Sequence, residues 1–358
     1  MSIKTSLTQR LGIDLPLIQG PMNGVSTIDL AVAVCEAEGL GSLAAAILSP
    51  AAMREQIAQL RSRTTRPFAV NLFVLGAPQV DEAQVLRARE WLAPFWRELG
   101  VAEELPSQWG QDFPAQFEVL VEAAPPVASF TFGILSAEQI ERLHARGTFV
   151  IGTATTLAEG RAWVEVGADA VCAQATEAGG HRGTFLVPFD DALIGGFALY
   201  RQMAAALAVP VIAAGGIMDG QGIAAALTLG AQAAQLGTAF IACPESSAPP
   251  AWKHAVMHAS ADSTRLTRAY SGRPARGIVN PFMQAMQAHE AELPPYPVQN
   301  ALTSPLRRAA AKAERADLLA LFAGQNAPLA RALPAAELVG VLGRETAAVL
   351  RAGAALLG

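Results

Sequence analysis

The amino-acid sequence predicts an α/β fold: a (β/α)8 TIM barrel with an additional, mainly helical substrate or lid region. Three observations lead to this prediction. Eight short apolar runs recur before residue 245, and helical stretches separate most of them. These runs do not alternate with polar residues, which is typical of parallel strands that are covered on both faces. The chain of 358 residues is also long enough for a barrel of about 250 residues and one further region.

The predicted helices between the strands have recognisable start and stop residues. Ser49 and Pro50 begin one helix, with proline in its first turn. Ser136 begins another, with Gln139 in the capping-box position, and Gly147 follows its end, where a left-handed residue is favoured. A doubly wound sheet is the alternative arrangement of such units. The strands are expected at Leu15–Gln19, Gly41–Ala45, Pro67–Leu72, Val127–Phe132, Phe149–Thr153, Ala170–Ala173, Val211–Ala214 and Ala234–Leu236, with helices at Ile28–Ala37, Ala51–Leu60 and Ala137–His144 among those between them.

Two segments do not fit a plain barrel. Gly76–Pro126 follows the third strand as an insertion with helical patches, and the chain beyond residue 245 is rich in Ala, Pro and Arg. Because both segments follow the carboxyl ends of barrel strands, we expect them to border the active-site mouth. We therefore predict a barrel over residues 1–245, with residues 76–126 inserted near the mouth. Residues 246–358 are predicted to form a mainly helical substrate or lid region whose last helices pack back on the barrel.

Composition and charge exclude several classes of protein. Hydrophobic residues make up 52% of the chain, which argues against disorder. The net charge is −5 and there is no basic run, so neither a nucleic acid nor an anionic membrane is an expected partner. The three cysteines lie far apart and indicate neither a disulfide framework nor a zinc site. Met1–Arg10 lacks the apolar run of a signal peptide, and glycines interrupt the uncharged stretch Gln221–Pro244, so the expected location is the cytoplasm.

Two glycine-containing turns follow the last two predicted strands. Gly215 and Gly216 come directly after one apolar strand, and Gly237 and Thr238 end the next. Glycines let a phosphate approach the backbone, and the N-terminus of a following helix favours an anion. The loops after strands seven and eight form the phosphate site of many barrels, so the pair predicts phosphate binding. Ordinary tight turns are the alternative reading.

His181 is the candidate catalytic residue. It follows the sixth predicted strand, and the flexible pair Gly179–Gly180 precedes it. Histidine suits proton transfer near neutral pH, and the carboxyl ends of barrel strands carry catalytic residues. A surface-loop histidine is the alternative. No carboxylate pair, His/Cys cluster or Ser–His arrangement has the spacing of a metal site or a nucleophile, so no metal is predicted.

Two further places offer groups for a flat heterocycle. Pro21, Met22 and Asn23 form a turn after the first strand, where the backbone can approach a ring and Met22 can pack on it. Asn71 ends the third strand and offers an amide for hydrogen bonding. An ordinary turn and a buried structural asparagine are the alternatives.

Seven segments carry a resemblance to a known family: Ile18–Met22, Arg66–Leu72, Glu177–Gly183, Ala214–Gly220, Gln235–Phe240, Ser271–Gly277 and Tyr296–Asn300. In these segments the chain resembles nitronate monooxygenase, formerly called 2-nitropropane dioxygenase, and in particular its bacterial class I branch. The resemblance runs from about Leu15 to Gln325. Its most specific part is Glu177–Gly183 together with the two tail segments.

The resemblance implies an FMN cofactor and the oxidation of alkyl nitronates, notably propionate 3-nitronate. Dioxygen would be the oxidant, and the reaction would pass through a flavin semiquinone. The products would be a carbonyl compound and nitrite, and the activity would serve detoxification. His181 would be the catalytic residue at the flavin face. The residues implied to hold FMN are Pro21, Met22, Asn23, Asn71, Gln174, Gly179, Gly180, Gly215, Gly216, Gln235, Leu236, Gly237 and Thr238.

Three positions of the substrate pocket depart from the family pattern. Thr131 stands where a histidine is usual, and Trp109 and Trp252 stand where tyrosines are common, whereas Tyr296 is retained. The departures remove one cationic candidate and two hydroxyl donors. The sequence therefore leaves the substrate open and allows a bulkier or more apolar one.

Three other functions stay open at this point. One is an FMN-dependent NAD(P)H reductase of quinones or enoyl thioesters, although no second dinucleotide motif is visible. Another is a flavin-binding protein without turnover. The last is a flavin-free phosphate-binding barrel such as an aldolase or synthase, although no Schiff-base lysine lies at a predicted strand end. The expected partners are the nitronate and dioxygen, in a monomer or homodimer, and His181 is open to a role as base or as anion anchor.

Overall fold

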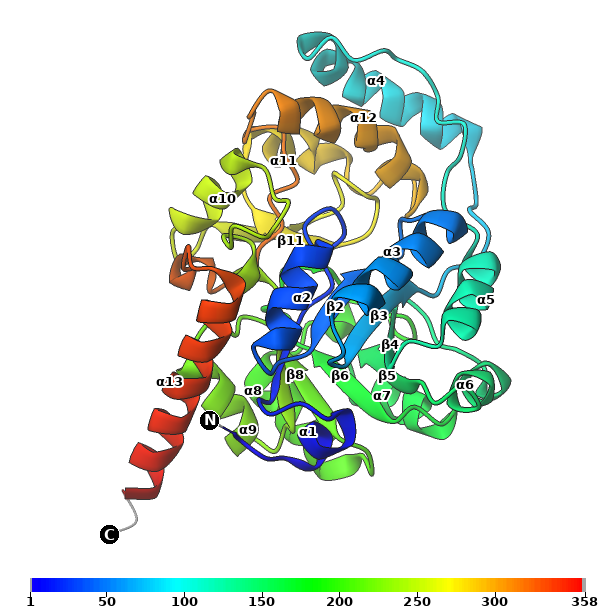
Figure 1. Ribbon diagram of the computed structural model, residues 1–358. Helices are drawn as coiled ribbons and strands as arrows, with labels where there is room; N and C mark the ends of the chain where they lie inside the picture. The colour runs from blue at the N-terminus through cyan, green and yellow to red at the C-terminus, as the bar shows by residue number, and fades with distance from the viewer. Residues whose placement is uncertain (1, 356–358) are drawn as a thin grey trace.

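The computed structural model describes residues 2–355, and its centre is a barrel of eight parallel strands (Figure 1). Neighbouring strands follow the order β1-β9-β8-β6-β5-β4-β3-β2. The ring closes between the first and last of these, because Gln19 donates its N–H to Leu40 O and Leu40 donates to Leu17 O, each at 2.9 Å. The strands are β1 (Leu17–Gln19), β2 (Gly41–Ala44), β3 (Phe68–Phe73), β4 (Val127–Thr131), β5 (Phe149–Ala154), β6 (Ala170–Gln174), β8 (Val211–Ala214) and β9 (Ala233–Leu236).

The predicted barrel is confirmed, and each observed strand boundary lies within two residues of its expected place. One difference has a visible cause. β4 ends at Thr131 rather than Phe132 because Phe132 has a φ of 79°, which is incompatible with a continuing strand. A non-glycine residue in this left-handed region is strained and is frequent at functional sites.

Each barrel strand is paired with a helix on the outside. These helices are α2 (Ile28–Glu36), α3 (Pro50–Arg63), α5 (Phe113–Ala123), α6 (Ala137–His144), α7 (Leu157–Glu165), α8 (Gly196–Ala206), α9 (Gly220–Thr228) and α13 (Ala335–Ala355). The expected start signals are present: Ser136 and Gln139 form a capping box at α6, and Ser49 caps α3 with Pro50 at its first position.

α13 is the eighth helix of the ring, although almost a hundred residues separate it from β9. It packs between α9 and α2, with Leu338, Val339 and Leu342 in the barrel core (Figure 1). The contact with α9 is close, because a Cβ on Gly220 would lie 2.2 Å from the Cβ of Glu345. Glu345 also accepts a hydrogen bond from the N–H of Gly220 at 3.0 Å. The last helix therefore fixes the start of α9.

The segment expected as one insertion, Gly76–Pro126, is divided in the structure. Its first part forms α4 (Glu82–Glu98), which packs on the helix α12 (Val298–Lys312) outside the barrel. Its second part forms α5, which packs on α3 and β3 as the helix of the third barrel unit. Asp112 caps α5 and Pro114 lies in its first turn, so this helix has local start signals of its own.

The chain between β9 and α13 forms most of a lid over the carboxyl ends of the strands. Its buried apolar residues make a second core that α4 shares, including Trp96, Phe282 and Leu302. The domain boundary at residue 245 stays a prediction. The lid elements are α10 (Pro250–Met257), β10 (Thr264–Thr267), β11 (Ala275–Ile278), α11 (Pro281–Met286) and α12, with short 3-10 helices η3 (Gln287–His289) and η4 (Ala327–Leu329); two others, η1 (Phe189–Ala192) and η2 (Thr238–Phe240), lie in the barrel loops.

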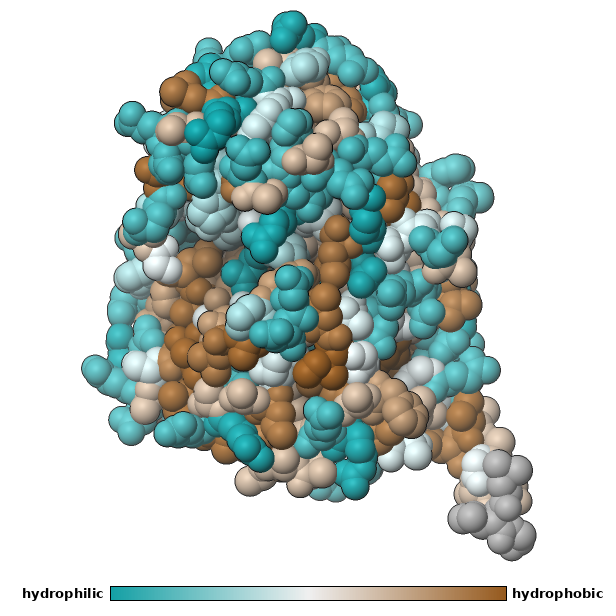
Figure 2. Space-filling model, turned by 180° about the vertical axis from the view of Figure 1, so that it is seen from behind, coloured by the Kyte–Doolittle hydropathy of each residue, from teal (hydrophilic) through white to brown (hydrophobic). Residues whose placement is uncertain are grey.

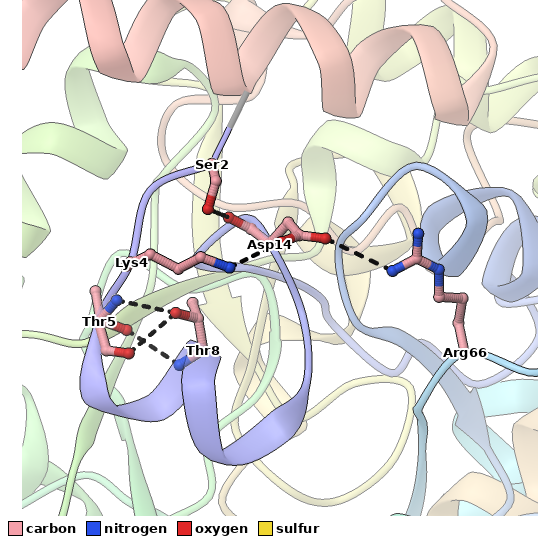
Figure 3. Close-up of polar contacts among 6 residues, drawn as sticks. All are labelled: Ser2, Lys4, Thr5, Thr8, Asp14 and Arg66. Atoms are coloured by element: carbon pink, nitrogen blue, oxygen red, sulfur yellow. Dashed lines mark hydrogen bonds and ion pairs between the residues drawn. The ribbon is translucent and has the colours of Figure 1, made fainter.

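The opposite end of the barrel is closed by α1 (Ser6–Leu11). Leu7 and Leu11 belong to a core cluster with strand residues that include Ile151 and Cys172. Figure 3 shows the polar contacts around this segment: Thr5 and Thr8 form a capping box, and Asp14 pairs with Lys4 at 2.8 Å and with Arg66 at 3.6 Å. These contacts are expected to contribute to the stability of the protein and not to catalysis, because barrel enzymes place their active sites at the other end of the barrel.

The surface differs between the two parts of the molecule. Seen from behind, apolar atoms gather on the barrel, whereas the lid above it is mainly hydrophilic (Figure 2). Phe197, at the start of α8, is 82% exposed. Within residues 2–355, no helix is long and apolar enough to cross a membrane.

Candidate active site

His181 lies where the barrel meets the lid. It belongs to the two-residue strand β7 (Gly180–His181), which leaves the loop after β6 and pairs antiparallel with β11 of the lid. Gln174, at the end of β6, holds this loop from both sides: its Nε2 donates to His181 O at 2.9 Å, and its Oε1 accepts from the N–H of Gly183 at 2.7 Å. The Gln174 amide therefore positions His181 and is already engaged with protein.

Arg182 fixes the same loop from beneath. Its side chain is 1% exposed, and its guanidinium donates to the carbonyl oxygens of Gln174, Ala175 and Ala192. A planar guanidinium suits several acceptors at once. The backbone that carries His181 is consequently rigid.

Four aromatic side chains pack together at the imidazole, three of them directly against it, and we call them the aromatic cluster: Phe73, Phe132, Tyr296 and Phe322. The ring centre of His181 lies 5.2 Å from that of Phe322, 5.6 Å from that of Phe132 and 5.7 Å from that of Tyr296. Phe73 stacks on Phe132 with ring centres 4.0 Å apart. They come from the ends of β3 and β4, the start of α12 and the segment after it, so barrel and lid both contribute.

The surroundings keep His181 neutral. Burial, together with the positive charges of Arg273 and Arg307, lowers the pKa of His181 to about 3. Burial raises the pKa of Tyr296 to about 12, so its phenol also stays neutral and can donate a hydrogen bond. The site thus combines two neutral polar groups with two nearby cations.

The predicted phosphate turns lie side by side, because β8 and β9 are neighbours. Gly215 has φ 137° and Gly216 has φ 65°, conformations that favour glycine. In the part of the chain from residue 2 to residue 355, the backbone N–H groups of Gly216, Gly237 and Thr238 donate to no protein acceptor. Unpaired N–H groups at such a turn form an anion-binding concavity.

A segment returning from the lid closes over these turns. The N–H of Gly324 donates to Thr238 Oγ1 at 2.9 Å, and Asn326 Nδ2 donates to Gly216 O at 2.7 Å. Gly179 packs against the same segment, since a Cβ on it would lie 2.5 Å from Gly324 N. The structure therefore gives Gly179 a packing reason to be glycine.

The expected ring-binding residues lie at two other strand ends: Met22 and Asn23 follow β1, the neighbour of β9, and Asn71 lies on β3. Asn71 is buried and donates to the carbonyl and hydroxyl oxygens of Ser129 at 3.1 and 3.0 Å, while its Oδ1 accepts no hydrogen bond from residues 2–355. Asn23 Oδ1 is buried and also lacks a donor within the described chain. Met22 Sδ lies 3.7 Å from the position of a Cβ on Gly237. Unpaired acceptors beside a glycine-lined anion cradle fit a heterocycle that carries a phosphate.

The predicted pocket residues come from both the barrel and the lid. Tyr296 belongs to the aromatic cluster, and Thr131 Oγ1 lies 3.2 Å from Thr153 Oγ1 at the strand ends. Trp109 precedes Gly110, whose Cβ would lie 2.9 Å from Pro297, next to Tyr296. Trp252 packs in the lid core on α10, and its Nε1 is buried without an acceptor among residues 2–355. A pocket role for Trp252 stays a prediction.

Sequence reasoning did not single out several residues of the site. Ser271 and Arg273 lie in a segment that carried the resemblance, but no pattern assigned them a role. Ser271 Oγ lies 2.8 Å from His181 Nε2, and the Arg273 guanidinium lies 4.0 Å from the ring centre of Phe132. Phe132 follows Thr131 directly, so the strand end indicated its place but not its strained backbone.

Comparison with known proteins finds nitronate monooxygenases and a nitroalkane oxidase among those similar to this chain. A nitronate monooxygenase of Paraburkholderia phytofirmans is 43% identical over 348 residues, which is 96% of this chain and 95% of that protein. A probable nitronate monooxygenase of Staphylococcus aureus is 38% identical over 334 residues, or 93% of this chain and 94% of that protein. A solved nitroalkane oxidase from Streptomyces ansochromogenes has a TM-score of 0.90 at 46% identity, covering 97% of this chain and 99% of that chain. FabK from Thermotoga maritima has a TM-score of 0.79 at 29% identity, covering 99% of this chain and 100% of that chain.

The fold, the site and these similarities define a flavin-dependent oxidoreductase built on a (β/α)8 barrel. A sequence profile described as nitronate monooxygenase matches residues 4–345. The chain therefore belongs to the nitronate monooxygenase family.

Proposed function

We propose that this protein binds FMN and oxidises alkyl nitronates with dioxygen, giving a carbonyl compound and nitrite. The observation that carries the proposal is the neutral His181, which lies beside Tyr296 and within the electrostatic influence of Arg273 and Arg307. A nitronate is an anion with two oxygens. Such a pocket offers it positive potential and hydrogen bonds.

The lid segment that covers the predicted phosphate turns supports FMN as the flavin. The backbone N–H groups of Gly216, Gly237 and Thr238 would hold the phosphate, and the Gly324–Asn326 segment lies directly above them. A ligand that ends in one phosphate fits this arrangement better than a dinucleotide. Asn71, Asn23 and the Met22 turn would hold the ring, while Gln174 would act through the loop that it fixes.

The state of His181 favours a nitronate over a neutral nitroalkane as substrate. An imidazole with a pKa near 3 accepts a proton weakly, so it is a poor general base for removing one from carbon. A nitronate arrives already deprotonated and needs only to be bound and oriented. In this proposal Tyr296 donates a hydrogen bond to a nitronate oxygen, the neutral His181 borders the bound substrate, and the aromatic cluster excludes water.

FMN, when bound, accepts the electrons of the nitronate and passes them to dioxygen. The protein's own part is to hold the substrate carbon over the barrel mouth. Rigid supports serve this: Arg182 ties down the loop, and β7 ties His181 to the lid. The expected location in the cytoplasm and the state as monomer or homodimer belong to the same proposal.

One anaerobic experiment tests the function. The purified protein, loaded with FMN, is mixed with ethylnitronate or propionate 3-nitronate without dioxygen, and the visible spectrum is recorded. We expect a rapid change of the flavin bands, and nitrite after dioxygen is admitted. Bleaching by NADH with no response to either nitronate would support instead the reductase that the likeness to FabK allows. A flavin that responds to none of these would contradict both.

A further inference from the structure

A glutamate behind the site is buried without a cationic partner. Glu159, in the first turn of α7, is 0% exposed and forms no ion pair within residues 2–355. Its Oε2 accepts from the N–H of Thr155 at 2.6 Å and from the hydroxyl of the same residue at 2.7 Å. Its Oε1 accepts from the N–H groups of Phe185 and Leu186 at 2.6 and 3.0 Å. A buried carboxylate is costly unless hydrogen bonds satisfy both oxygens, and these four donors do so.

The bonds of Glu159 differ from those that its place in the helix would suggest. Thr156 caps α7, and Glu159 is the third residue of the helix, from which a glutamate usually bonds back to the cap residue. Here Oε1 is used instead for a backbone segment that begins 26 residues further along the chain. Glu159 therefore joins α7 to the loop that follows His181.

The same loop carries a cation of the lid. Arg273 lies in the loop before β11 and donates from Nε to Arg182 O at 2.9 Å and from Nη2 to Thr184 O. The carbonyl of Thr184 and the N–H of Phe185 belong to one planar peptide unit, in which the two groups point in opposite directions. This unit therefore lies between two charges, with its N–H toward Glu159 and its carbonyl toward Arg273. Hydrogen bonds aligned in this way strengthen one another.

Arg273 is in direct contact with the site. Its guanidinium carbon lies 4.0 Å from the ring centre of Phe132, and that ring lies 5.6 Å from the ring of His181 and 5.4 Å from that of Tyr296. The backbone carbonyl of Arg273 also accepts from Ser271 Oγ, the partner of His181. Burial lowers the pKa of Arg273 to about 10, so the guanidinium stays charged at neutral pH. Arg273 thus brings a full positive charge to the aromatic cluster.

A charge held on an aromatic ring in a buried place needs support from its other side. The bonds from the Glu159 carboxylate end at Thr155 and the 185–186 backbone, so it reaches the site only through the peptide that it shares with Arg273. We propose that Glu159 is a positioning residue of the active site: it orients the peptide between Thr184 and Phe185 and thereby holds Arg273 where its charge attracts an anionic substrate. The inference rests on the proposed function, in which the nitronate is that anion.

The first test is the substitution Glu159→Gln. It removes the charge and turns an amide NH2 toward one pair of N–H donors, so the peptide loses its fixed orientation. We expect KM for ethylnitronate to rise by about tenfold, the usual effect of losing one hydrogen bond to a charged group. The change in kcat should stay below about threefold, because the charge of Arg273 attracts the anion equally in the ground state and the transition state.

A double-mutant cycle separates positioning from general stability. Arg273→Gln alone should raise KM by about tenfold or more. If Glu159 acts through Arg273, adding Glu159→Gln to that variant should raise KM by less than about twofold further. A further rise of about tenfold, or an unchanged KM in Glu159→Gln alone, would overturn the proposal.

Asp169→Asn is the matched control. Asp169 is also a carboxylate that accepts from a backbone N–H, that of Val150 at 2.9 Å, but it lies at the closed end of the barrel beside Arg10 and His144. Its loss should lower the melting temperature and leave KM for ethylnitronate unchanged. A rise in KM equal to that in Glu159→Gln would show that any loosened strand connection has this effect, and the proposal would fail.

Thr184→Val is a milder variant that decides the question if Glu159→Gln does not fold. Thr155 gives its single hydroxyl proton to Glu159, so Thr184 Oγ1 donates to Thr155 Oγ1 at 2.8 Å. Removing this bond loosens the same loop and keeps the carbonyl that Arg273 binds. We expect KM to rise by about two- to threefold, and to show no such rise when Arg273→Gln is already present. No rise, or an equal rise in both backgrounds, would contradict the role of the loop.

A binding measurement distinguishes this proposal from the function on which it rests. Nitrate, an unreactive planar anion, is titrated into the FMN-loaded protein and followed through the absorption bands of the flavin. We expect Kd for nitrate to rise by about tenfold in Glu159→Gln, and no further when Arg273→Gln is also present.

Each outcome of the nitrate titration decides one point. If the wild type oxidises no nitronate but shows the expected pattern of Kd values, the function fails while the positioning role of Glu159 stands. If the wild type oxidises ethylnitronate but Glu159→Gln leaves both Kd and KM unchanged, the positioning role fails while the function stands. A wild type that neither binds nitrate nor oxidises ethylnitronate would contradict both.

Discussion

His181 Nε2 lies 2.8 Å from Ser271 Oγ, although 90 residues separate the two in the chain. Ser271 Oγ also donates to Arg273 O at 3.1 Å, and a hydroxyl has a single proton to give. Nε2 therefore carries the proton of the neutral imidazole and donates it to Ser271. This leaves Nδ1 of His181 as the hydrogen-bond acceptor on the other side of the ring.

Removing the hydrogen bond between His181 and Ser271 should impair turnover without unfolding the protein. In Ser271→Ala, His181 loses the partner that sets its tautomer and ring orientation. We expect kcat/KM for propionate 3-nitronate to fall by about tenfold, corresponding to one hydrogen bond of typical strength. Ser263→Ala removes an exposed hydroxyl that bonds Ser260 O, and should leave kcat/KM unchanged. Equal losses in both variants would show that the His181–Ser271 bond has no special role.

The low pKa of His181 should appear as a loss of stability in acid. The folded-state value of about 3 lies below the value of 6.5 for a free imidazole. Between these values the unfolded chain binds the proton and the folded chain does not, so the free energy of unfolding falls as the pH drops from 6.5 towards 3. His181→Gln lacks this contribution. Its melting temperature should therefore decline less than that of the wild type between pH 7 and pH 4.5, and parallel declines would contradict the neutral state of His181.

Crowding at Gly324–Asn326, the segment of the lid that covers the phosphate turns, should reduce flavin binding. A Cβ on Gly179 would lie 2.5 Å from Gly324 N, and neither backbone can move far. We expect Gly179→Ala to destabilise the protein by about 1–3 kcal/mol, the usual cost of overpacking. The flavin-to-protein ratio should fall with it, because the segment that covers Gly216 and Thr238 is displaced. Gly76→Ala meets nothing within 4 Å and serves as the control.

The closed end of the barrel should govern stability and not catalysis. Leu7 is 0% exposed in the core beneath the strands, so Leu7→Ala should cost about 2–5 kcal/mol in the free energy of unfolding. The neighbouring pair Lys4–Asp14 is solvent-exposed, although Lys4 lowers the pKa of Asp14, and Lys4→Ala should cost about 0–1 kcal/mol (Figure 3). Urea unfolding measures both. Under native conditions kcat should stay at the wild-type value in both variants.

The sequence predicted features that short stretches determine. Buried strands such as Val211–Ala214 consist of consecutive apolar residues, and the glycine turns follow directly from them, so their position needs no knowledge of distant contacts. α13 was expected only in outline, as a helix that packs back on the barrel. Its place between α9 and α2 depends on packing between segments far apart in the chain.

The composition of the pocket was the least predictable part. His181 was visible because glycines flank it after a strand. Ser271 and Phe322 approach it only through the pairing of β7 with β11 and through the bridge between Gly277 and Phe322. Arg307 lies on a helix face of mixed polarity. The sequence alone does not distinguish it from an exposed arginine, because its surroundings depend on how the lid folds.

The position of α13 also constrains the order in which the chain can fold during synthesis. When the ribosome has added β9, all eight barrel strands exist, but the helix that covers α9 and α2 is still almost a hundred residues away. The nascent barrel therefore exposes apolar surface for as long as the lid is being translated. Because α13 completes the layer only at the very end, a truncated chain that contains every strand and every flavin-contacting turn would still present an open seam to chaperones and proteases.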